Sequence, residues 1–165
     1  MPSCRPDVIP EILYRLIAMR PNTILDVGMG HGKWGVLCHE YLRYWCGIEP
    51  EVDGVEVFRE YESPAHAVYR EIFYDNVVNL LDKVGNYDLV LAVDVIEHLS
   101  RDDGLRFIDS IEKHYIISTP NYWLPQEACF GNEHERHVSV WRAEDFANYT
   151  LVPDRVGRSH IVGWR

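Results

Sequence analysis

The stretch from Ile24 to Leu37 carries the first residues whose types and spacing could do chemistry. An apolar run there leads into glycines at positions 28, 30, 32 and 35, and the acidic Asp26 stands just before them. A glycine inside a regular element costs roughly 0.5–1 kcal/mol relative to alanine, so four of them in eight positions need a reason. Because glycine lets a ligand approach the backbone closely, the pattern predicts a loop that binds a phosphate, a dinucleotide or another nucleoside ligand.

Two phosphate-binding motifs fit this loop poorly. A P-loop needs Gly-Lys followed by a serine or threonine that binds magnesium, but Gly32 and Lys33 are followed by a tryptophan. A dinucleotide fingerprint would have to use Gly30, Gly32 and Gly35, although Gly28 already makes the turn after the strand. The ligand is therefore expected to be a different nucleoside compound.

The elements that must position this loop follow from hydrophobic periodicity. Apolar runs predict strands at 23–27, 53–58, 71–73, 87–95 and 114–119. Helical spacing predicts helices at 8–19, 33–45, 63–69, 101–113 and 142–149. The chain is expected to be irregular at 120–140 and to end in a hairpin that turns around 154–157. This alternation predicts an α/β fold: a single Rossmann-like, doubly wound sandwich with a mainly parallel sheet and a C-terminal antiparallel hairpin. Ligands of such sheets bind at the carboxyl ends of the strands.

The set Asp26, Gly28, Gly30 and Gly32 resembles the first motif of class I S-adenosylmethionine-dependent methyltransferases. The likeness continues in "YDLVLAVDVIEHLS" and "YIISTPN", and so covers nearly the whole chain from about Ile24 onward. It implies that the glycine loop passes under the amino-acid and ribose parts of S-adenosylmethionine, and that Asp26 contacts the methionine end. Acidic groups favour this cofactor because it carries an ammonium and a sulfonium cation.

Three further residues are expected to bind the cofactor. Glu56 ends the second strand, 24 residues after Gly32, where a carboxylate can accept two hydrogen bonds from ribose hydroxyls. Val57, together with the following phenylalanine, can pack on the adenine. The resemblance also places Asp75 near the adenine amino group.

Asp94, Glu97 and His98 follow the fourth strand and are expected to face the cleft, with Asp94 among the cofactor-binding residues. Their acid-x-x-Glu-His spacing resembles ubiquinone-pathway O-methyltransferases and small-RNA 2′-O-methyltransferases. Those enzymes use such residues, with a later histidine, to hold a divalent cation near the accepting hydroxyl. The resemblance implies that Glu97, His98 and His137 bind Mg²⁺, Mn²⁺ or Fe²⁺, with Asp94 as a further ligand and His134 as the competitor of His137. The RNA branch has Glu in place of Asp94, and this shorter acid reaches less far.

The two histidines also fit other roles. His98 or His137 could act as a general base without a metal, since a neutral imidazole suits proton removal near pH 7. A structural role, as a helix cap or a hydrogen bond across the sheet, is the third alternative. A zinc site built from Cys129, His134 and His137 has weak support because its spacing is irregular.

The sequence predicts an S-adenosylmethionine-dependent methyltransferase that transfers the methyl group in line to a small-molecule acceptor, with oxygen favoured as the accepting atom. A non-catalytic protein of the same fold, binding the cofactor or a partner subunit, is the alternative. A nicotinamide-dependent oxidoreductase is the less favoured rival. The loop at 120–140 carries Tyr122, Trp123 and Phe130, and either covers the cleft or packs the C-terminal helix onto the sheet.

Length, composition and charge restrict the possible number of domains, the possible ligands and the expected location of the protein. The 165 residues suffice for one domain, expected at 1–165, with 47% hydrophobic and 25% charged residues. The net charge of −10 and the scattered basic residues argue against a broad nucleic-acid surface. No apolar run approaches the roughly 18 residues of a membrane helix, and the N-terminus has no signal-peptide pattern. Four cysteines without a CxxC motif indicate a cytoplasmic location. The sequence gives no indication of the oligomeric state.

Overall fold

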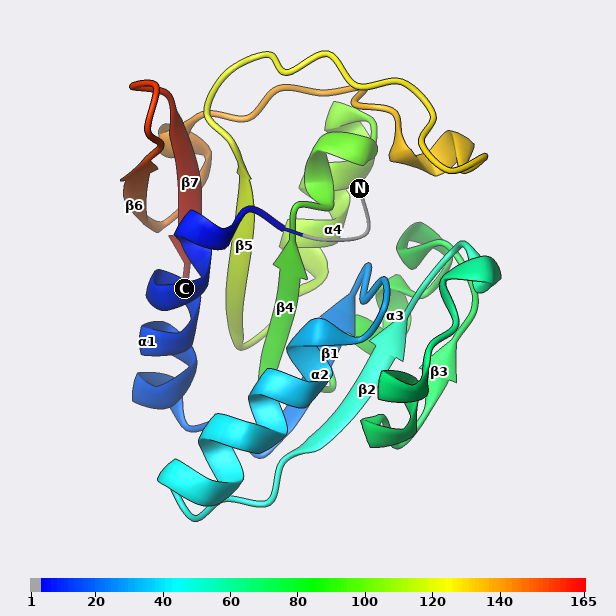
Figure 1. Ribbon diagram of the computed structural model, residues 1–165, viewed down its shortest axis with the longest axis vertical. Helices are drawn as coiled ribbons and strands as arrows, with labels where there is room; N and C mark the ends of the chain where they lie inside the picture. Colours follow the sequence, from blue (N-terminus) through cyan, green and yellow to red (C-terminus); the bar gives the residue numbers. More distant parts are fainter. Residues whose placement is uncertain (1–3) are drawn as a thin grey trace.

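The computed structural model describes residues 4–165, and Figure 1 shows a central sheet with helices on both faces. The strands are β1 (Thr23–Val27), β2 (Glu51–Val55), β3 (Ile72–Phe73), β4 (Leu89–Val93), β5 (His114–Pro120), β6 (Asn148–Pro153) and β7 (Ser159–Trp164). They lie in the order β3-β2-β1-β4-β5-β7-β6. The first five are parallel, and β7 runs antiparallel to both β5 and β6. This topology confirms the predicted fold class, including the terminal hairpin.

The α-helices are α1 (Ile9–Met19), α2 (Lys33–Cys38), α3 (Leu81–Val84) and α4 (Arg101–Ser110). A π-helix, η2 (His39–Trp45), continues α2. The 3₁₀ turns are η1 (Pro6–Val8), η3 (Arg59–Tyr61), η4 (Pro64–Val68), η5 (Val77–Asn79), η6 (Ile96–His98), η7 (Glu133–Glu135) and η8 (Ala143–Asp145).

Three predicted elements differ from the structure. The helix expected at 63–69 is only the 3₁₀ turn η4, capped by the Ser63 hydroxyl. The helix expected at 142–149 is wrong beyond the single turn η8, because the chain must already be extended at Asn148 to pair with β7. The second strand ends at Val55, so Glu56 stands just past its carboxyl end.

The core lies on both faces of the sheet. Successive side chains of a strand point to opposite faces of the sheet, so neighbouring residues of β1 pack in different parts of the core. Leu25 and Val27 pack with Phe107 of α4 on one face, whereas Ile24 packs with Ile12 of α1 on the other. Because both faces are covered, the parallel strands are apolar almost without interruption, as the sequence indicated.

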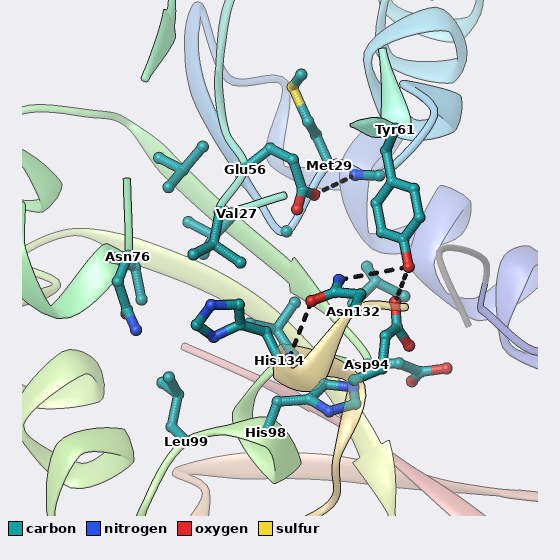
Figure 2. A pocket seen from close by; sticks show the side chains of 18 of the residues that line it. Val27, Met29, Glu56, Tyr61, Asn76, Asp94, His98, Leu99, Asn132 and His134 are labelled. Atoms are coloured by element: carbon teal, nitrogen blue, oxygen red, sulfur yellow. Dashed lines mark hydrogen bonds between the residues drawn. The ribbon is translucent and has the colours of Figure 1, made fainter. Parts of the chain in front are cut away.

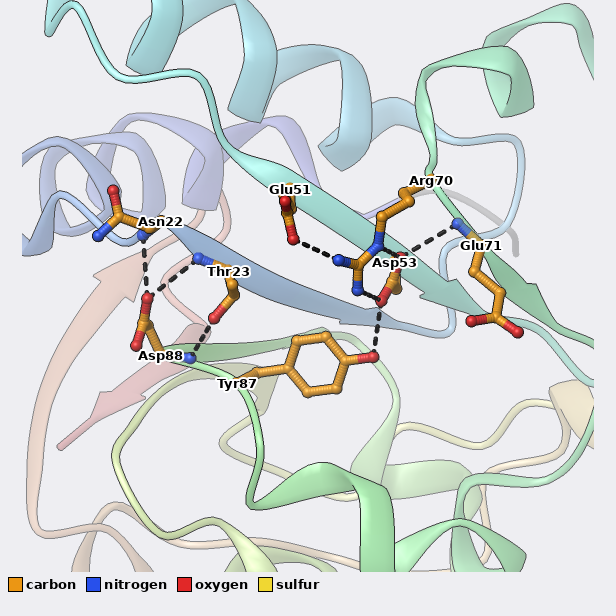
Figure 3. Close-up of polar contacts among 8 residues, drawn as sticks. All are labelled: Asn22, Thr23, Glu51, Asp53, Arg70, Glu71, Tyr87 and Asp88. Carbon is orange, nitrogen blue, oxygen red and sulfur yellow. Dashed lines mark hydrogen bonds and ion pairs between the residues drawn. The ribbon is translucent and has the colours of Figure 1, made fainter.

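A buried carboxylate ties the edge of the sheet together (Figure 3). Asp53 of β2 is 1% exposed and accepts hydrogen bonds from the Arg70 guanidinium, the Tyr87 hydroxyl and the Glu71 backbone N–H. Arg70 also pairs with Glu51. The short strand β3 and the segment before β4 are thereby joined to β2.

The long segment between β5 and β6 runs across the carboxyl ends of the parallel strands (Figure 1). Its Trp141 is completely buried, and its indole N–H donates to the Ile96 carbonyl oxygen at 3.1 Å. Trp123 and Phe130, in contrast, are exposed. Within residues 4–165, no helix has the length and apolar character needed to cross a membrane.

Candidate functional site

The glycine loop has the backbone shape that only glycine adopts readily. Gly28, Gly30 and Gly32 have φ values of +66°, +54° and +86°. A side chain on Gly28 would in addition place its Cβ 2.5 Å from Val95 Cγ2. The Gly28 N–H donates to the Val55 carbonyl oxygen at 2.9 Å, which holds the loop against the end of β2. Glycine adopts this left-handed backbone without steric strain, which accounts for glycine at these three positions, and the close approach of a ligand to the loop stays a prediction.

The loop forms one wall of a cleft at the carboxyl ends of β1, β2 and β4, with about 870 Å³ of empty space that is partly open to solvent. Figure 2 shows Asn76 and Leu99 on one side of the cleft and Tyr61 and Asp94 on the other. The predicted residues that line it are Gly28, Gly30, Glu56, Val57, Asp75, Asp94 and His98. Four predicted residues are not part of this lining: Asp26, Gly32, Glu97 and His137.

Glu56 joins the cleft to the glycine loop. Its Oε2 accepts the Gly30 N–H at 2.9 Å, and its Oε1 accepts the Phe58 N–H at 2.9 Å (Figure 2). The side chain is 5% exposed. Burial raises the pKa of Glu56 above its usual value, although the two backbone N–H groups oppose this shift. Each carboxylate oxygen has a second lone pair, so Glu56 can accept further hydrogen bonds from a ligand.

Asp26 does not line the cleft. It lies on the same face of β1 as Ile24, and its Oδ2 accepts the Tyr69 hydroxyl at 2.5 Å. The Tyr69 hydroxyl oxygen also accepts a hydrogen bond from the Gly35 N–H, so the Asp26–Tyr69 pair is joined to the first turn of α2. Burial raises the pKa of Asp26 to about 7, and the Oδ1 atom has no hydrogen-bond partner among the described residues. Contact of Asp26 with the methionine end of a cofactor stays a prediction.

Gly32, Val57 and Asp75 occupy different surroundings. Gly32 is buried against Ala65 and His66 rather than in the cleft wall. Val57 is 37% exposed and offers apolar surface at the rim. The Asp75 carboxylate accepts hydrogen bonds from the backbone of the next residue and from an asparagine side chain one turn later.

Asp94 contacts one residue of each of the two next strands of the sheet, β5 and β7. Its backbone has the left-handed φ of +56°, which aspartate tolerates better than most residues. The Ser118 hydroxyl donates to Asp94 Oδ1 at 2.5 Å, and His160 Nε2 lies 3.3 Å from the same oxygen. Burial alone would raise the pKa of Asp94, but His160 and Ser118 outweigh it and the pKa lies below its usual value.

Glu97, His98 and His137 come together although they are separated by up to 40 positions. One ligand atom from each of the three lies within 4.8 Å of the others. The imidazole rings of His98 and His137 meet edge to face with centroids 4.8 Å apart. The Glu97 carboxyl is 2% exposed, and its Oε2 has no hydrogen-bond partner among the described residues. In residues 4–165 this is the group that could hold a metal ion, and neither Cys129 nor His134 belongs to it.

The protonation of this cluster follows from its surroundings. His98 Nδ1 lies 3.0 Å from the Arg136 carbonyl oxygen, and because a carbonyl only accepts, Nδ1 carries the hydrogen and Nε2 the lone pair. Burial lowers the pKa of His98, and burial together with His98 lowers the pKa of His137 to about 4. Burial and the nearby Asp94 charge hold the pKa of Glu97 well above its usual range.

The segment after β5 covers part of the cleft. Glu135 is 6% exposed, and its Oε1 accepts the Tyr61 hydroxyl at 2.8 Å. Asn132 Nδ2 lies 3.4 Å from the same hydroxyl oxygen, and both residues line the cleft with His134 (Figure 2). This supports the first of the two roles expected for the loop, while its buried Trp141 packs on α4.

Sequence reasoning missed several residues of the site. Lys33 lines the cleft, and its place directly after the glycine loop was a usable signal. Tyr61 and Glu135 meet across 74 positions, and His160 reaches Asp94 from the terminal hairpin. No local pattern in the sequence predicts these contacts, because they depend on how distant segments pack.

Known structures share this architecture. The 1,6-didemethyltoxoflavin-N1-methyltransferase of Burkholderia thailandensis, solved with 1,6-didemethyltoxoflavin and S-adenosylhomocysteine, matches with a TM-score of 0.65 at 18% identity, over 96% of this chain and 77% of that one. The methyltransferase domain of the bacterial CtHen1-CN matches with a TM-score of 0.59 at 18% identity, over 96% of both chains. TehB from Haemophilus influenzae matches with a TM-score of 0.65 at 12% identity, over 94% of this chain and 60% of that one.

These likenesses establish the class I methyltransferase fold for the chain. Comparison with protein-family models and with curated proteins gives no match.

Proposed function

We propose that the chain is an S-adenosylmethionine-dependent methyltransferase that acts on a small-molecule acceptor, with oxygen as the favoured accepting atom. The observation that carries this proposal is the contact between the glycine loop and Glu56. Three left-handed glycines bring the Gly30 N–H to 2.9 Å from a carboxylate at the end of β2, inside a cleft. This arrangement fits a nucleoside whose ribose hydroxyls bind the carboxylate.

Different residues of the cleft would bind different parts of the cofactor. When bound, S-adenosylmethionine supplies an electrophilic methyl group on a positively charged sulfur. Glu56 accepts the ribose hydroxyls, and Val57 and Val77 give apolar surface to the adenine ring. Asp75 and Asp94 add further acceptors to the cleft lining. Holding the acceptor against the methyl group supplies much of the acceleration, since it replaces a bimolecular encounter by a fixed geometry.

His98 is the residue that we assign to proton removal from an acceptor hydroxyl. It lines the cleft, and its Nδ1–H is already directed to the Arg136 carbonyl oxygen. The Nε2 atom is therefore the one that can take the proton. His137 lies against the His98 ring and could share this role.

The divalent cation expected from the sequence is supported by the chemistry of the donor set. Glu97, His98 and His137 offer one carboxylate and two imidazoles close together, and the buried Glu97 Oε2 lacks a hydrogen-bond partner among the described residues. Such ligands suit Mn²⁺ or Fe²⁺, and a carboxylate also suits Mg²⁺. A bound ion would use the same His98 lone pair, so it would be an alternative to His98 as the base, and it would polarise the acceptor hydroxyl.

The charge of the cleft supports a small molecule over a nucleic acid. Its lining includes four carboxylates, Glu56, Asp75, Asp94 and Glu135, and Lys33 as its single lysine or arginine among residues 4–165. The whole chain has a net charge of −10. Phosphate backbones bind to clustered cations, so this surface repels them.

The first test is calorimetric titration with S-adenosylhomocysteine, with NAD as the control ligand. We expect micromolar binding that Glu56→Ala abolishes, whereas Glu60→Ala, an exposed acid four positions away, leaves it unchanged.

An acceptor screen with and without EDTA then follows. Loss of methylation with EDTA and its return with Mn²⁺ would support the metal, and undiminished methylation in EDTA would favour His98 as a base acting without one.

The outcome separates the two functions that the fold allows. Binding followed by methyl transfer to a small hydroxyl compound supports the proposal. Binding without turnover on any acceptor supports the non-catalytic alternative. Absence of binding by the unchanged protein refutes the cofactor assignment.

A further inference from the structure

Gly30 of the glycine loop is hydrogen-bonded through both of its backbone polar groups. Its N–H donates to Glu56 Oε2 at 2.9 Å, and its carbonyl oxygen lies 2.8 Å from Nε2 of His66 in η4. Because a carbonyl oxygen only accepts, His66 Nε2 carries the hydrogen and donates it. Glu56 lines the cleft, whereas His66 does not. Gly30 therefore links a histidine outside the cleft to the carboxylate inside it.

His66 is buried at a cost that this hydrogen bond offsets. The side chain is 7% exposed, and its Nδ1 atom has no hydrogen-bond partner among the described residues. A leucine of similar size would fill the same space without burying an unpartnered polar atom. The bond to the Gly30 carbonyl oxygen is thus the interaction for which an imidazole is needed at this position.

The turn η4 holds the glycine loop at a second point. The Ser63 hydroxyl, just before η4, donates to the His31 carbonyl oxygen at 2.8 Å. The same hydroxyl caps η4 by accepting the Ala65 N–H at 3.1 Å. A side chain on Gly32 would place its Cβ 3.2 Å from His66 Cδ2 and 3.3 Å from Ala65, so η4 packs directly on the loop. Two successive carbonyl groups of the loop are therefore held by one turn.

The bond from His66 restricts the residue of the loop that can rotate most easily. Gly30 has a φ of +54°, and a glycine can leave this region for others without steric cost. Its N–H belongs to the peptide group before the Cα and its carbonyl to the one after it, so Glu56 and His66 together restrict both backbone rotations. Without His66, the Gly30 N–H could turn away from Glu56, which would then lose one of its two backbone donors.

We infer that His66 is a positioning residue: through Gly30 it holds the Glu56 carboxylate in the orientation that accepts the ribose hydroxyls of the cofactor. The inference rests on the proposed function, since the ribose belongs to that cofactor. A carboxylate that is already oriented loses less conformational freedom when the ligand binds, and this raises affinity. Because His66 acts on Glu56 alone, its loss weakens only ligands whose ribose hydroxyls Glu56 binds.

The test is calorimetric titration with two ligands, S-adenosylhomocysteine and its 2′,3′-dideoxy analogue, whose ribose lacks both hydroxyl groups. We expect His66→Leu to weaken S-adenosylhomocysteine binding by roughly 3- to 10-fold, which corresponds to the net contribution of one hydrogen bond. Its affinity for the dideoxy analogue should stay within about twofold of the unchanged protein. His114→Leu is the matched control, because it removes an imidazole bonded to the Arg165 carbonyl oxygen at the start of β5, and it should change neither affinity.

His66→Gln and His66→Asn keep the test decisive if His66→Leu does not fold. The glutamine amide nitrogen takes the place of the imidazole Nε2 and should restore S-adenosylhomocysteine affinity to within about twofold, whereas the shorter asparagine should not reach the Gly30 carbonyl oxygen. Thermal unfolding of each variant checks folding. Equal losses for both ligands, or equal affinities of His66→Gln and His66→Asn, would overturn the inference while leaving the proposed function intact. If the unchanged protein did not bind S-adenosylhomocysteine, the proposed function itself would fall, and the inference with it.

Discussion

The buried Asp26 carboxyl leads to a prediction about how the free energy of unfolding depends on pH, and this prediction involves no ligand. Its pKa is about 7 in the folded protein against an ordinary 3.8, because burial penalises the charged form. Between these values the native state keeps a proton that the unfolded chain has lost. The free energy of unfolding therefore falls as the pH rises from about 4 to about 7.

The size of this effect follows from the shift. A difference of about 3 pH units at about 1.36 kcal/mol each corresponds to roughly 4 kcal/mol of stability lost across that range. The side chain is 1% exposed, so solvent screening does not reduce it. Asp26→Asn keeps the acceptor for the Tyr69 hydroxyl and removes the titration. Relative to the unchanged protein, the variant should gain roughly 4 kcal/mol between pH 4 and pH 8.

Urea denaturation at half-unit steps between pH 4 and pH 8 measures this difference. Asp109→Asn, at an exposed position of α4, provides the control and should run parallel to the unchanged protein. The reasoning is refuted if the stability difference between Asp26→Asn and the unchanged protein stays constant over the whole range. A constant difference would mean that the pKa of Asp26 is the same in the folded and the unfolded protein.

Two further predictions concern packing. Arg70→Ala should lower the free energy of unfolding more than the loss of an exposed ion pair does, because the buried Asp53 carboxylate then loses its guanidinium partner. Arg43→Ala, which breaks an exposed ion pair, should cost less than about 1 kcal/mol in the same urea titration, and equal losses would contradict the distinction. Gly104→Ala should destabilise the protein by about 1–3 kcal/mol, since the new Cβ would lie 2.3 Å from the Trp141 ring. Thermal unfolding followed by tryptophan fluorescence checks it, and an unchanged midpoint would show that the ring moves aside freely.

Local patterns carried much of the fold. The apolar runs predicted β1, β4 and β5 because strands covered on both faces are apolar along their whole length. The spacing of the glycines at 28, 30 and 32 predicted a ligand-binding loop after the first strand, and the structure adds that all three have a left-handed backbone. The elements that went wrong, at 63–69 and 142–149, are short, and there pairing and capping with other segments outweigh helical spacing.

The sequence by itself determined that polar side chains gather where the strands end, since Glu56, Asp94 and His98 each follow an apolar strand or its turn. Only the tertiary structure decided which of these groups meet. The alternation of β1 places Asp26 on the same face as Ile24, where it bonds to Tyr69 and does not line the cleft, although it stands next to the glycine loop. His137 reaches His98 because the segment after β5 folds back across the sheet. The spacing of residues along the chain indicates only contacts within one element or its adjoining turn. A contact between distant segments depends on how the elements between them pack.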